Sequence, residues 1–225
     1  MLLTDQTDAS FLRGVRGVIF DCDGVLIDSY EANRAYYNQY RKHFGLPPMN
    51  KEEADATHIL NVFESIRRII PEHLYDQAVA YRDRLDYREI MPYLRREPGV
   101  RRFVRWLSGA GLLLAVNTNR MDTMPLVLQA IELEGLFHPV MTSATVTRSK
   151  PDPEGVEKIL AAWGVARGEV AFLGDSSVDE QTARNAGVPF WAFKNPALRA
   201  DLHVPGFPEL HRAFARAFPE RDEQS

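Results

Sequence analysis

The sequence predicts an α/β protein in which a doubly wound, mostly parallel sheet carries helices on both faces and is interrupted by a helical insertion. Three observations predict this fold class. Short apolar runs of strand length recur, and each is followed by polar or turn-forming residues. Segments with helical spacing of apolar residues lie between those runs, and one long stretch, residues 30–96, keeps helical spacing throughout.

Five of the apolar runs are predicted to be buried strands because they are short and stop at polar loops. They are residues 15–21 (VRGVIFD), 112–117 (LLLAVN), 139–142 (PVMT), 170–173 (VAFL) and 190–193 (FWAF). Helical spacing predicts helices over residues 100–107, 127–131 and 156–163. Because strand and helix alternate, we expect crossover connections and therefore parallel strands.

Residues 30–96 break this alternation because they contain no convincing buried strand. Val62, Ile66 and Ile69 mark one face of a helix that Pro71 ends, and a further helix starts near Leu74. We therefore expect a doubly wound core built from residues 1–29 and 97–225, with an α-helical insertion over residues 30–96.

Composition narrows the class of partner. The 225 residues are 45% hydrophobic and 26% charged, with a formal net charge of −4, which is ordinary for a globular protein and gives no electrostatic reason to expect nucleic acid or an anionic membrane. No stretch reaches the ~20 apolar residues of a membrane span, and the N-terminus lacks the pattern of a signal peptide. Cys22 is the only cysteine, so no internal disulfide forms. We expect a cytoplasmic protein that acts on a small molecule.

The residues directly after the predicted strands carry the chemistry, because ligands of open parallel sheets sit beyond the carboxyl ends of the strands. Polar side chains of three kinds gather at these places: carboxylates, one cation, and hydroxyl or amide donors. They are Asp21, Asp23, Thr118, Asn119, Lys150, Asp175 and Asp179. This set of groups suits phosphoryl transfer.

Asp21 is the candidate nucleophile, since a carboxylate can form a covalent intermediate. Its charge repels a phosphate dianion by roughly 8 kcal/mol at ~4 Å and an effective dielectric of 20, so a cation must lie between them. Carboxylate oxygens favour Mg²⁺, and Asp21 and Asp175 can supply such ligands. Lys150 adds a second positive charge, and Thr118 can donate to the phosphoryl oxygens.

Asp23 is two residues beyond Asp21, so both side chains share a face if the strand geometry continues. It is the candidate general acid and base. The side chain of Cys22 should point to the opposite face and is interpreted as core. For Asp179 two interpretations stay open, contact with the metal and capping of the following helix, and Thr118 could likewise cap a helix.

The pattern resembles the haloacid dehalogenase superfamily. Its four motifs occur in order: DCDG after the first strand, Thr118 after the second, the Lys150-Pro pair, and, after the fourth strand, GDSSVD, which contains Asp175 and ends at Asp179. The resemblance covers about residues 15–204. It implies a three-layer Rossmann-like core with an α-helical cap inserted between the first two motifs. It also implies magnesium held by Asp21, the backbone carbonyl of Asp23 and Asp175, with Asp179 in a second-shell or water-mediated position that orients Lys150.

Within the superfamily, DGVLIDS and KPDPEG resemble the phosphoglycolate phosphatase and beta-phosphoglucomutase branch. The expected function is therefore a Mg²⁺-dependent phosphatase that hydrolyses a small phosphate monoester through an aspartyl-phosphate, with Thr118, Asn119 and Lys150 binding the phosphate. A phosphosugar mutase is the alternative, and a non-enzymatic binding module on the same fold is the third. Arg120 stands where relatives often carry Lys.

Overall fold

The structure is a computed structural model that describes the backbone of residues 1–60 and 62–222. The chain forms two compact units. One combines Met1–Ile27 with the chain from Arg96 onward, and the other is Asp28–Arg95. The two units are described separately below.

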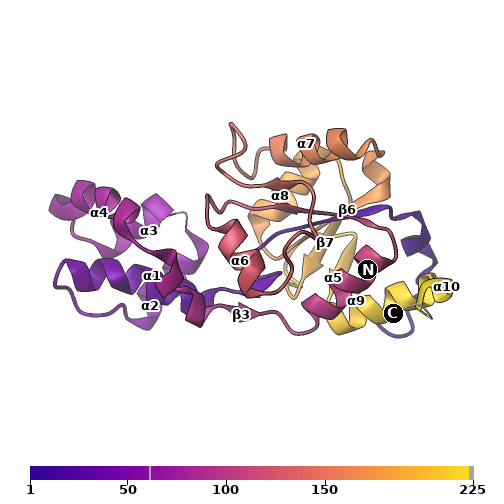
Figure 1. The fold of residues 1–225 in the computed structure, drawn as a ribbon, viewed down its shortest axis with the longest axis horizontal. Helices are drawn as coiled ribbons and strands as arrows, with labels where there is room; N and C mark the ends of the chain where they lie inside the picture. Colours follow the sequence, from indigo (N-terminus) through magenta and orange to yellow (C-terminus); the bar gives the residue numbers. More distant parts are fainter. Residues whose placement is uncertain (61, 223–225) are drawn as a thin grey trace. The chain divides into compact units, whose positions relative to one another are not determined.

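The first unit is built on a six-stranded sheet with the order β5-β4-β1-β6-β7-β8 (Figure 1). Every neighbouring pair of these strands is parallel. The strands are β1 (Gly17–Phe20), β4 (Leu113–Asn117), β5 (Val140–Met141), β6 (Val170–Gly174), β7 (Phe190–Phe193) and β8 (Leu202–Val204). The chain leaves β1 toward one edge through β4 and β5 and later returns to fill the other edge, so β1 lies at the switch point where ligands of such sheets bind.

Helices cover both faces of this sheet. On one face, α7 (Glu154–Trp163) and α8 (Ser177–Ala186) pack over β1 and β6 in a core that includes Ile19, Phe172 and Ile159. On the other, α5 (Val100–Gly109) and α9 (Phe207–Ala217) bring Phe103 and Phe207 into contact at 5.6 Å between ring centroids, and Phe207 also contacts Phe20 and Phe193. The unit also contains η1 (Ser10–Gly14), α6 (Met124–Ala130), η6 (Arg167–Glu169) and α10 (Pro219–Asp222). The predicted fold class, a three-layer α/β core, is confirmed.

All five predicted strands are present, although the structure shortens three of them by one to three residues and extends residues 170–173 by one. β8 was not predicted. It is three residues long and pairs with β7 through Trp191 and Leu202. Two further strands of two residues each, β2 (Ile27–Asp28) and β3 (Arg95–Arg96), form a second, two-stranded sheet. Segments this short give too little apolar periodicity to be recognised in a sequence.

The second unit is helical. It contains α1 (Tyr30–His43), α2 (Lys51–Ile59), α3 (Val62–Ile69), α4 (Tyr75–Tyr81) and the short turns η2 (Glu72–Leu74), η3 (Arg82–Arg84), η4 (Tyr87–Glu89) and η5 (Met91–Tyr93). Its buried centre is rich in aromatic and aliphatic side chains, among them Tyr37, Tyr40, Ile66 and Ile69. The hydroxyls of Tyr36 and Tyr40 are 3.0 Å apart, so this polar pair is satisfied inside the unit.

Among the described residues, none of the helices combines the length and the apolar character that crossing a membrane requires.

Candidate active site

The parallel register brings the ends of three strands to one level. Phe20 is opposite Val116 on one side and Leu173 on the other, and the Asp21 N–H donates to the Leu173 carbonyl at 2.9 Å. The residues that follow these strands therefore meet at one edge of the sheet. Asp21, Thr118 and Asp175 all come from this edge, as the sequence predicted for residues just beyond the strands.

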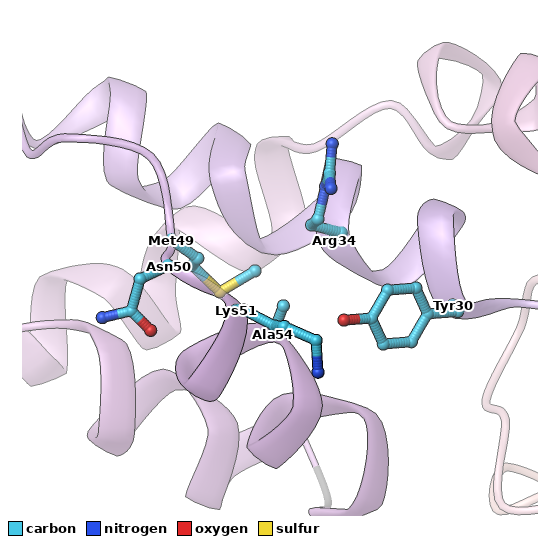
Figure 2. A pocket seen from close by; sticks show the side chains of 6 residues that line it. All are labelled: Tyr30, Arg34, Met49, Asn50, Lys51 and Ala54. Carbon is cyan, nitrogen blue, oxygen red and sulfur yellow. The ribbon is translucent and has the colours of Figure 1, made fainter.

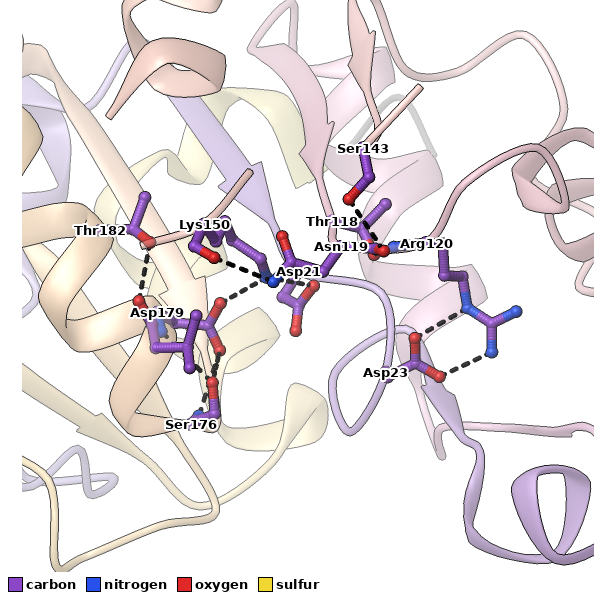
Figure 3. Close-up of polar contacts among 11 residues, drawn as sticks. Asp21, Asp23, Thr118, Asn119, Arg120, Ser143, Lys150, Ser176, Asp179 and Thr182 are labelled. Atoms are coloured by element: carbon purple, nitrogen blue, oxygen red, sulfur yellow. Dashed lines mark hydrogen bonds and ion pairs between the residues drawn. The ribbon is translucent and has the colours of Figure 1, made fainter. Parts of the chain in front are cut away.

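Three carboxylates converge here around one lysine. Asp21, Asp175 and Asp179 each have a carboxylate oxygen within 4.8 Å of those of the other two. The Lys150 ammonium lies 2.8 Å from Asp21 Oδ1 and 2.6 Å from Asp179 Oδ1, and only 5% of its side chain is exposed (Figure 3). Residues that are up to 158 positions apart in sequence, Asp21 and Asp179, thus share a single cation.

Asp179 is held from both ends. Its Oδ1 accepts from Lys150, while its Oδ2 accepts from the Ser176 N–H at 3.1 Å and from Ser176 Oγ at 2.5 Å. Ser176 is the N-cap of α8, and the two residues form a reciprocal capping box. Asp179 is fully buried, and its contacts are those of a helix cap and of a partner for Lys150. Asp179 therefore caps α8, and it also pairs with Lys150.

Asp175 differs from the other two acids. Among the described residues, no hydrogen-bond donor or ion-pair partner from another residue reaches its carboxylate, which can therefore offer an oxygen to a ligand. The side chain packs instead against Gly24, where a Cβ would lie 2.0 Å from Asp175 Oδ2. Gly24 also has a φ of +76°, a conformation that favours glycine. The glycine of the DCDG motif is therefore required by both the backbone and the acid beside it.

Asp23 takes a different direction from Asp21. β1 ends at Phe20, and the Cys22 carbonyl then accepts from Leu26 N–H at 2.9 Å in a tight turn, so the strand alternation does not extend to Asp23. Its carboxylate forms a two-pronged ion pair with Arg120, with Nε and Nη2 each 2.7 Å from an oxygen (Figure 3). The structure thus brings Asp21, Asp175, Asp179 and Lys150 together and directs the Asp23 side chain to Arg120.

Thr118 and Asn119 support the site through backbone contacts. Thr118 is 3% exposed, and its Oγ1 accepts from the Arg120 N–H at 3.2 Å. Asn119 donates from Nδ2 to the Lys150 carbonyl at 3.1 Å, and its own carbonyl accepts from Ser143 Oγ. Asn119 was predicted to bind substrate; the contact that the structure gives it holds the loop of Lys150.

Burial and mutual repulsion raise the pKa values of two carboxyl groups at the site. Burial first, and the Asp179 carboxylate second, raise the pKa of Asp21 well above its usual range. The same two causes raise the pKa of Asp175 to about 7. Burial alone would disfavour the Lys150 ammonium, but Asp179 and Asp21 outweigh it and raise its pKa. Three acids with one lysine leave an excess of negative charge, and hard oxygen donors in this excess fit a divalent cation such as Mg²⁺.

Cys22, which lies between Asp21 and Asp23, is fully buried, and burial raises the pKa of its thiol. A buried, protonated thiol is a poor nucleophile, which agrees with the interpretation of Cys22 as a core residue.

Sequence reasoning missed three residues that contact the site. Ser176 could have been recognised, because Ser176-x-x-Asp179 has the spacing of a capping box. Arg120 was noted only as a departure from relatives. Asn195, which donates from Nδ2 to the Asp175 carbonyl at 2.8 Å, carries no sequence signal, since its partner is a backbone atom 20 residues away.

The helical unit contains a pocket of about 330 Å³, lined by Tyr30, Arg34, Met49, Asn50, Lys51 and Ala54 (Figure 2). Each of its two cations is paired with an acid. Arg34 lies 3.4 Å from Glu31, and Lys51 lies 2.8 Å from Asp55. These ion pairs leave the pocket without a strong charge preference for a ligand.

Comparison with known proteins places this geometry in a family. The family model described as haloacid dehalogenase-like hydrolase matches residues 18–193. A phosphoglycolate phosphatase of Pseudomonas syringae pv. tomato is 30% identical over 182 residues, which make up 76% of this chain and 66% of that protein, so the chain spans about two thirds of that relative. Pyrophosphatase PpaX of Listeria welshimeri serovar 6b is 29% identical over 187 residues, 80% of this chain and 85% of that one.

Among solved structures, a haloacid dehalogenase-superfamily hydrolase of subfamily IA, variant 1, from Geobacter sulfurreducens is 35% identical. It superimposes with a TM-score of 0.78 and covers 90% of this chain and 96% of its own. The resemblance predicted from the four motifs is confirmed. The chain belongs to the haloacid dehalogenase-like hydrolase family.

Proposed function

We propose that the protein is a Mg²⁺-dependent phosphatase that hydrolyses small-molecule phosphate monoesters, with Asp21 as the nucleophile. One observation carries the proposal: three carboxylates lie within 4.8 Å of one another, and Lys150 bridges two of them. The proposal is supported by the position of the buried Asp21 carboxylate, which lies beside the Lys150 ammonium at the switch point of the sheet.

In the first step, an Asp21 oxygen attacks phosphorus while the bond from phosphorus to the ester oxygen breaks. The leaving oxygen takes a proton from Asp23, whose carboxyl group turns from Arg120 to reach it and, once out of that ion pair, carries a proton taken from solvent. The product is an aspartyl-phosphate on Asp21 and a free alcohol. Lys150 and Thr118 hold the phosphoryl oxygens, and Asn119 keeps the Lys150 loop in place through the carbonyl of that residue.

In the second step, water attacks phosphorus and the bond to Asp21 breaks, so that inorganic phosphate forms and Asp21 is regenerated. Asp23 accepts the proton that the water gives up. The ion pair with Lys150 orients the Asp21 carboxylate for the first attack.

Bound Mg²⁺ would supply the charge that offsets repulsion between the nucleophile and the phosphate. The residues present fit it, because Asp175 lies beside Asp21 and its carboxylate has no ion-pair partner within the part of the chain that the structure describes. We propose Asp21, Asp175 and the Asp23 backbone carbonyl as ligands, with Asp179 acting mainly through Lys150. We further propose that the helical unit, Asp28–Arg95, is the cap that selects the substrate, and that the protein works in the cytoplasm, where a single buried thiol needs no disulfide partner.

Release of inorganic phosphate from a panel of esters tests the proposal. The names of the relatives recommend phosphoglycolate and pyrophosphate, and glucose 1-phosphate belongs in the panel because a mutase would isomerise it without releasing phosphate. We expect Mg²⁺-dependent release that EDTA abolishes. Asp21→Asn should lose activity, whereas Asp5→Asn, which alters an exposed acid paired with Arg212, should retain it. Absence of turnover across the whole panel would refute the proposal.

A further inference from the structure

The side chain of Asp175 has less support from its neighbours than those of the other two acids of the cluster. Asp21 and Asp179 are each fixed by Lys150, but among the described residues no group of another residue hydrogen bonds to the Asp175 carboxylate, whose only donor is the residue's own backbone. A metal ligand without such support must be oriented through its backbone, since a small displacement weakens coordination. The contact with Gly24 limits the side chain on one side only.

Asn195 supplies the missing support. Its Nδ2 donates to the Asp175 carbonyl at 2.8 Å, and its Oδ1 accepts from the Ala197 N–H at 3.1 Å. Both ends of the amide are therefore engaged, which fixes its orientation. Asn195 follows β7, the strand beside β6, so the bond ties the end of one strand to the acid at the end of the next.

The turn that presents Asn195 is itself held in an unusual conformation. Lys194 has a φ of +53°, which residues other than glycine seldom adopt, and such conformations persist where the surroundings impose them. The Lys194 N–H donates to the Val204 carbonyl at 2.9 Å, and its ammonium lies 2.6 Å from the carboxylate of Glu97, a residue that is 7% exposed. The strained turn is thus anchored to β8 and to a buried acid.

We propose that Asn195 is a positioning residue of the metal site, which sets the affinity for a divalent cation by fixing the backbone of Asp175. The Lys194–Glu97 ion pair presents Asn195 in the required place. This inference rests on the proposed function, because it assigns a supporting residue to the same site. Asn195 would hold the backbone of Asp175 at the end of β6 in the way that Asn119 holds the backbone of Lys150, through a hydrogen bond from Nδ2 to a carbonyl.

Direct titration with Mg²⁺ tests the inference, with calorimetry as the readout and activity against Mg²⁺ concentration as a second. Asn195→Ser keeps an oxygen near the Ala197 N–H but is too short to reach the Asp175 carbonyl. Asn195→Gln keeps the amide and displaces it by one methylene. Both should raise the Kd for Mg²⁺ about 10- to 100-fold, the usual effect of losing a supporting residue. The KM for the ester at saturating Mg²⁺ should stay as in the wild type.

Asn185→Ser is the matched control. Asn185 also donates from Nδ2 to a carbonyl, that of Pro151 at 2.9 Å, and its Oδ1 accepts from Gln181. Its Kd for Mg²⁺ should equal that of the wild type. Thermal unfolding in EDTA checks that each variant is folded. If one Asn195 variant does not fold, the Kd of the other variant tests the inference.

A wild-type Kd in both Asn195 variants overturns the inference, as does equal weakening in Asn185→Ser. In either case wild-type protein that binds Mg²⁺ and releases phosphate leaves the proposed function standing. If the wild type neither binds Mg²⁺ nor releases phosphate from any ester, the proposed function fails and the role of Asn195 fails with it.

Discussion

The two units of the chain bury polar groups in different ways. The helical unit buries uncharged groups, such as the paired hydroxyls of Tyr36 and Tyr40, and exposes most of the charge in ion pairs such as Lys51 with Asp55. The sheet unit instead buries charge. Lys150 and two of its acid neighbours, Asp21 and Asp179, are nearly inaccessible.

This difference indicates that the catalytic chemistry lies in the sheet unit. Burying a charge is costly unless it is paired, and an excess of buried carboxylates is costlier still. A fold selected for stability alone would not retain three acids around one lysine. The helical unit also shields an ion pair, Arg41 with Glu53, but there one cation meets one acid and the side chains are 11% and 21% exposed. The unbalanced arrangement in the sheet unit therefore indicates a functional demand.

Removal of Lys150 should produce the largest effect. Lys150→Met leaves Asp21 and Asp179 without their shared cation, and breaking a buried pair in this way destabilises by about 3–5 kcal/mol. Activity should fall roughly a thousandfold, the loss expected when one fixed group that stabilises the transition state is removed. Urea unfolding in EDTA and phosphate-release assays measure the two effects.

Lys51→Met is the counterpart in the helical unit. The side chain of Lys51 is 87% exposed, so the loss of its pair with Asp55 should leave the unfolding midpoint and the chemical step unchanged. Equal destabilisation by the two lysine substitutions would contradict the contrast between the units.

Gly24 and Gly45 give a smaller, matched comparison. Both have positive φ, +76° and +67°, so an alanine at either position introduces backbone strain of about 1–2 kcal/mol. A Cβ at Gly45 meets nothing within 4 Å, whereas one at Gly24 would collide with Asp175. Gly24→Ala should therefore also weaken Mg²⁺ binding about tenfold or more, and Gly45→Ala should not. Calorimetric titration distinguishes them, and equal Kd values would count against the role of Asp175.

A further expected effect concerns pH in metal-free protein. Burial and then Asp179 raise the pKa of Asp175 from 3.8 to about 7 on folding. Between about pH 4 and 7 the folded state therefore binds a proton that the unfolded chain has released, so the free energy of unfolding decreases as pH rises through this range. Asp175→Asn removes this contribution and should lose less stability between pH 5 and 8.

Denaturant titrations in EDTA at several pH values check this expectation. Saturating Mg²⁺ should reverse the loss in the wild type at pH 8, because the ion favours the ionised carboxylate, but not in Asp175→Asn. If the free energies of unfolding of wild type and variant change with pH in parallel, Asp175 is not the source of the pH dependence.

Much of the sheet and of the acid cluster could be predicted, because both depend on local pattern. Strands such as residues 170–173 are apolar runs, and Asp175 follows one of them directly. The parallel register then brings Asp21 and Asp175 together without further information. By contrast β8 is too short, and contains His203, to give a strand signal.

Other contacts at the site depend on tertiary placement. The pairing of Asp23 with Arg120 requires the chain to leave strand geometry after Phe20, and nothing in the residue pattern fixes that turn. The bond from Asn195 to the Asp175 carbonyl is equally hidden, because a backbone acceptor is the same for every residue type.

The central claim is that Asp21 carries the phosphoryl group during turnover. Rapid acid quenching of the protein with Mg²⁺ and a substrate that it hydrolyses, followed by mass spectrometry of its peptides, tests this most directly. We expect a phosphoryl group on Asp21 in the peptide that contains this residue, and no phosphoryl group on that peptide in Asp21→Asn. Phosphoryl transfer to a different residue, or turnover that persists in Asp21→Asn, would contradict it.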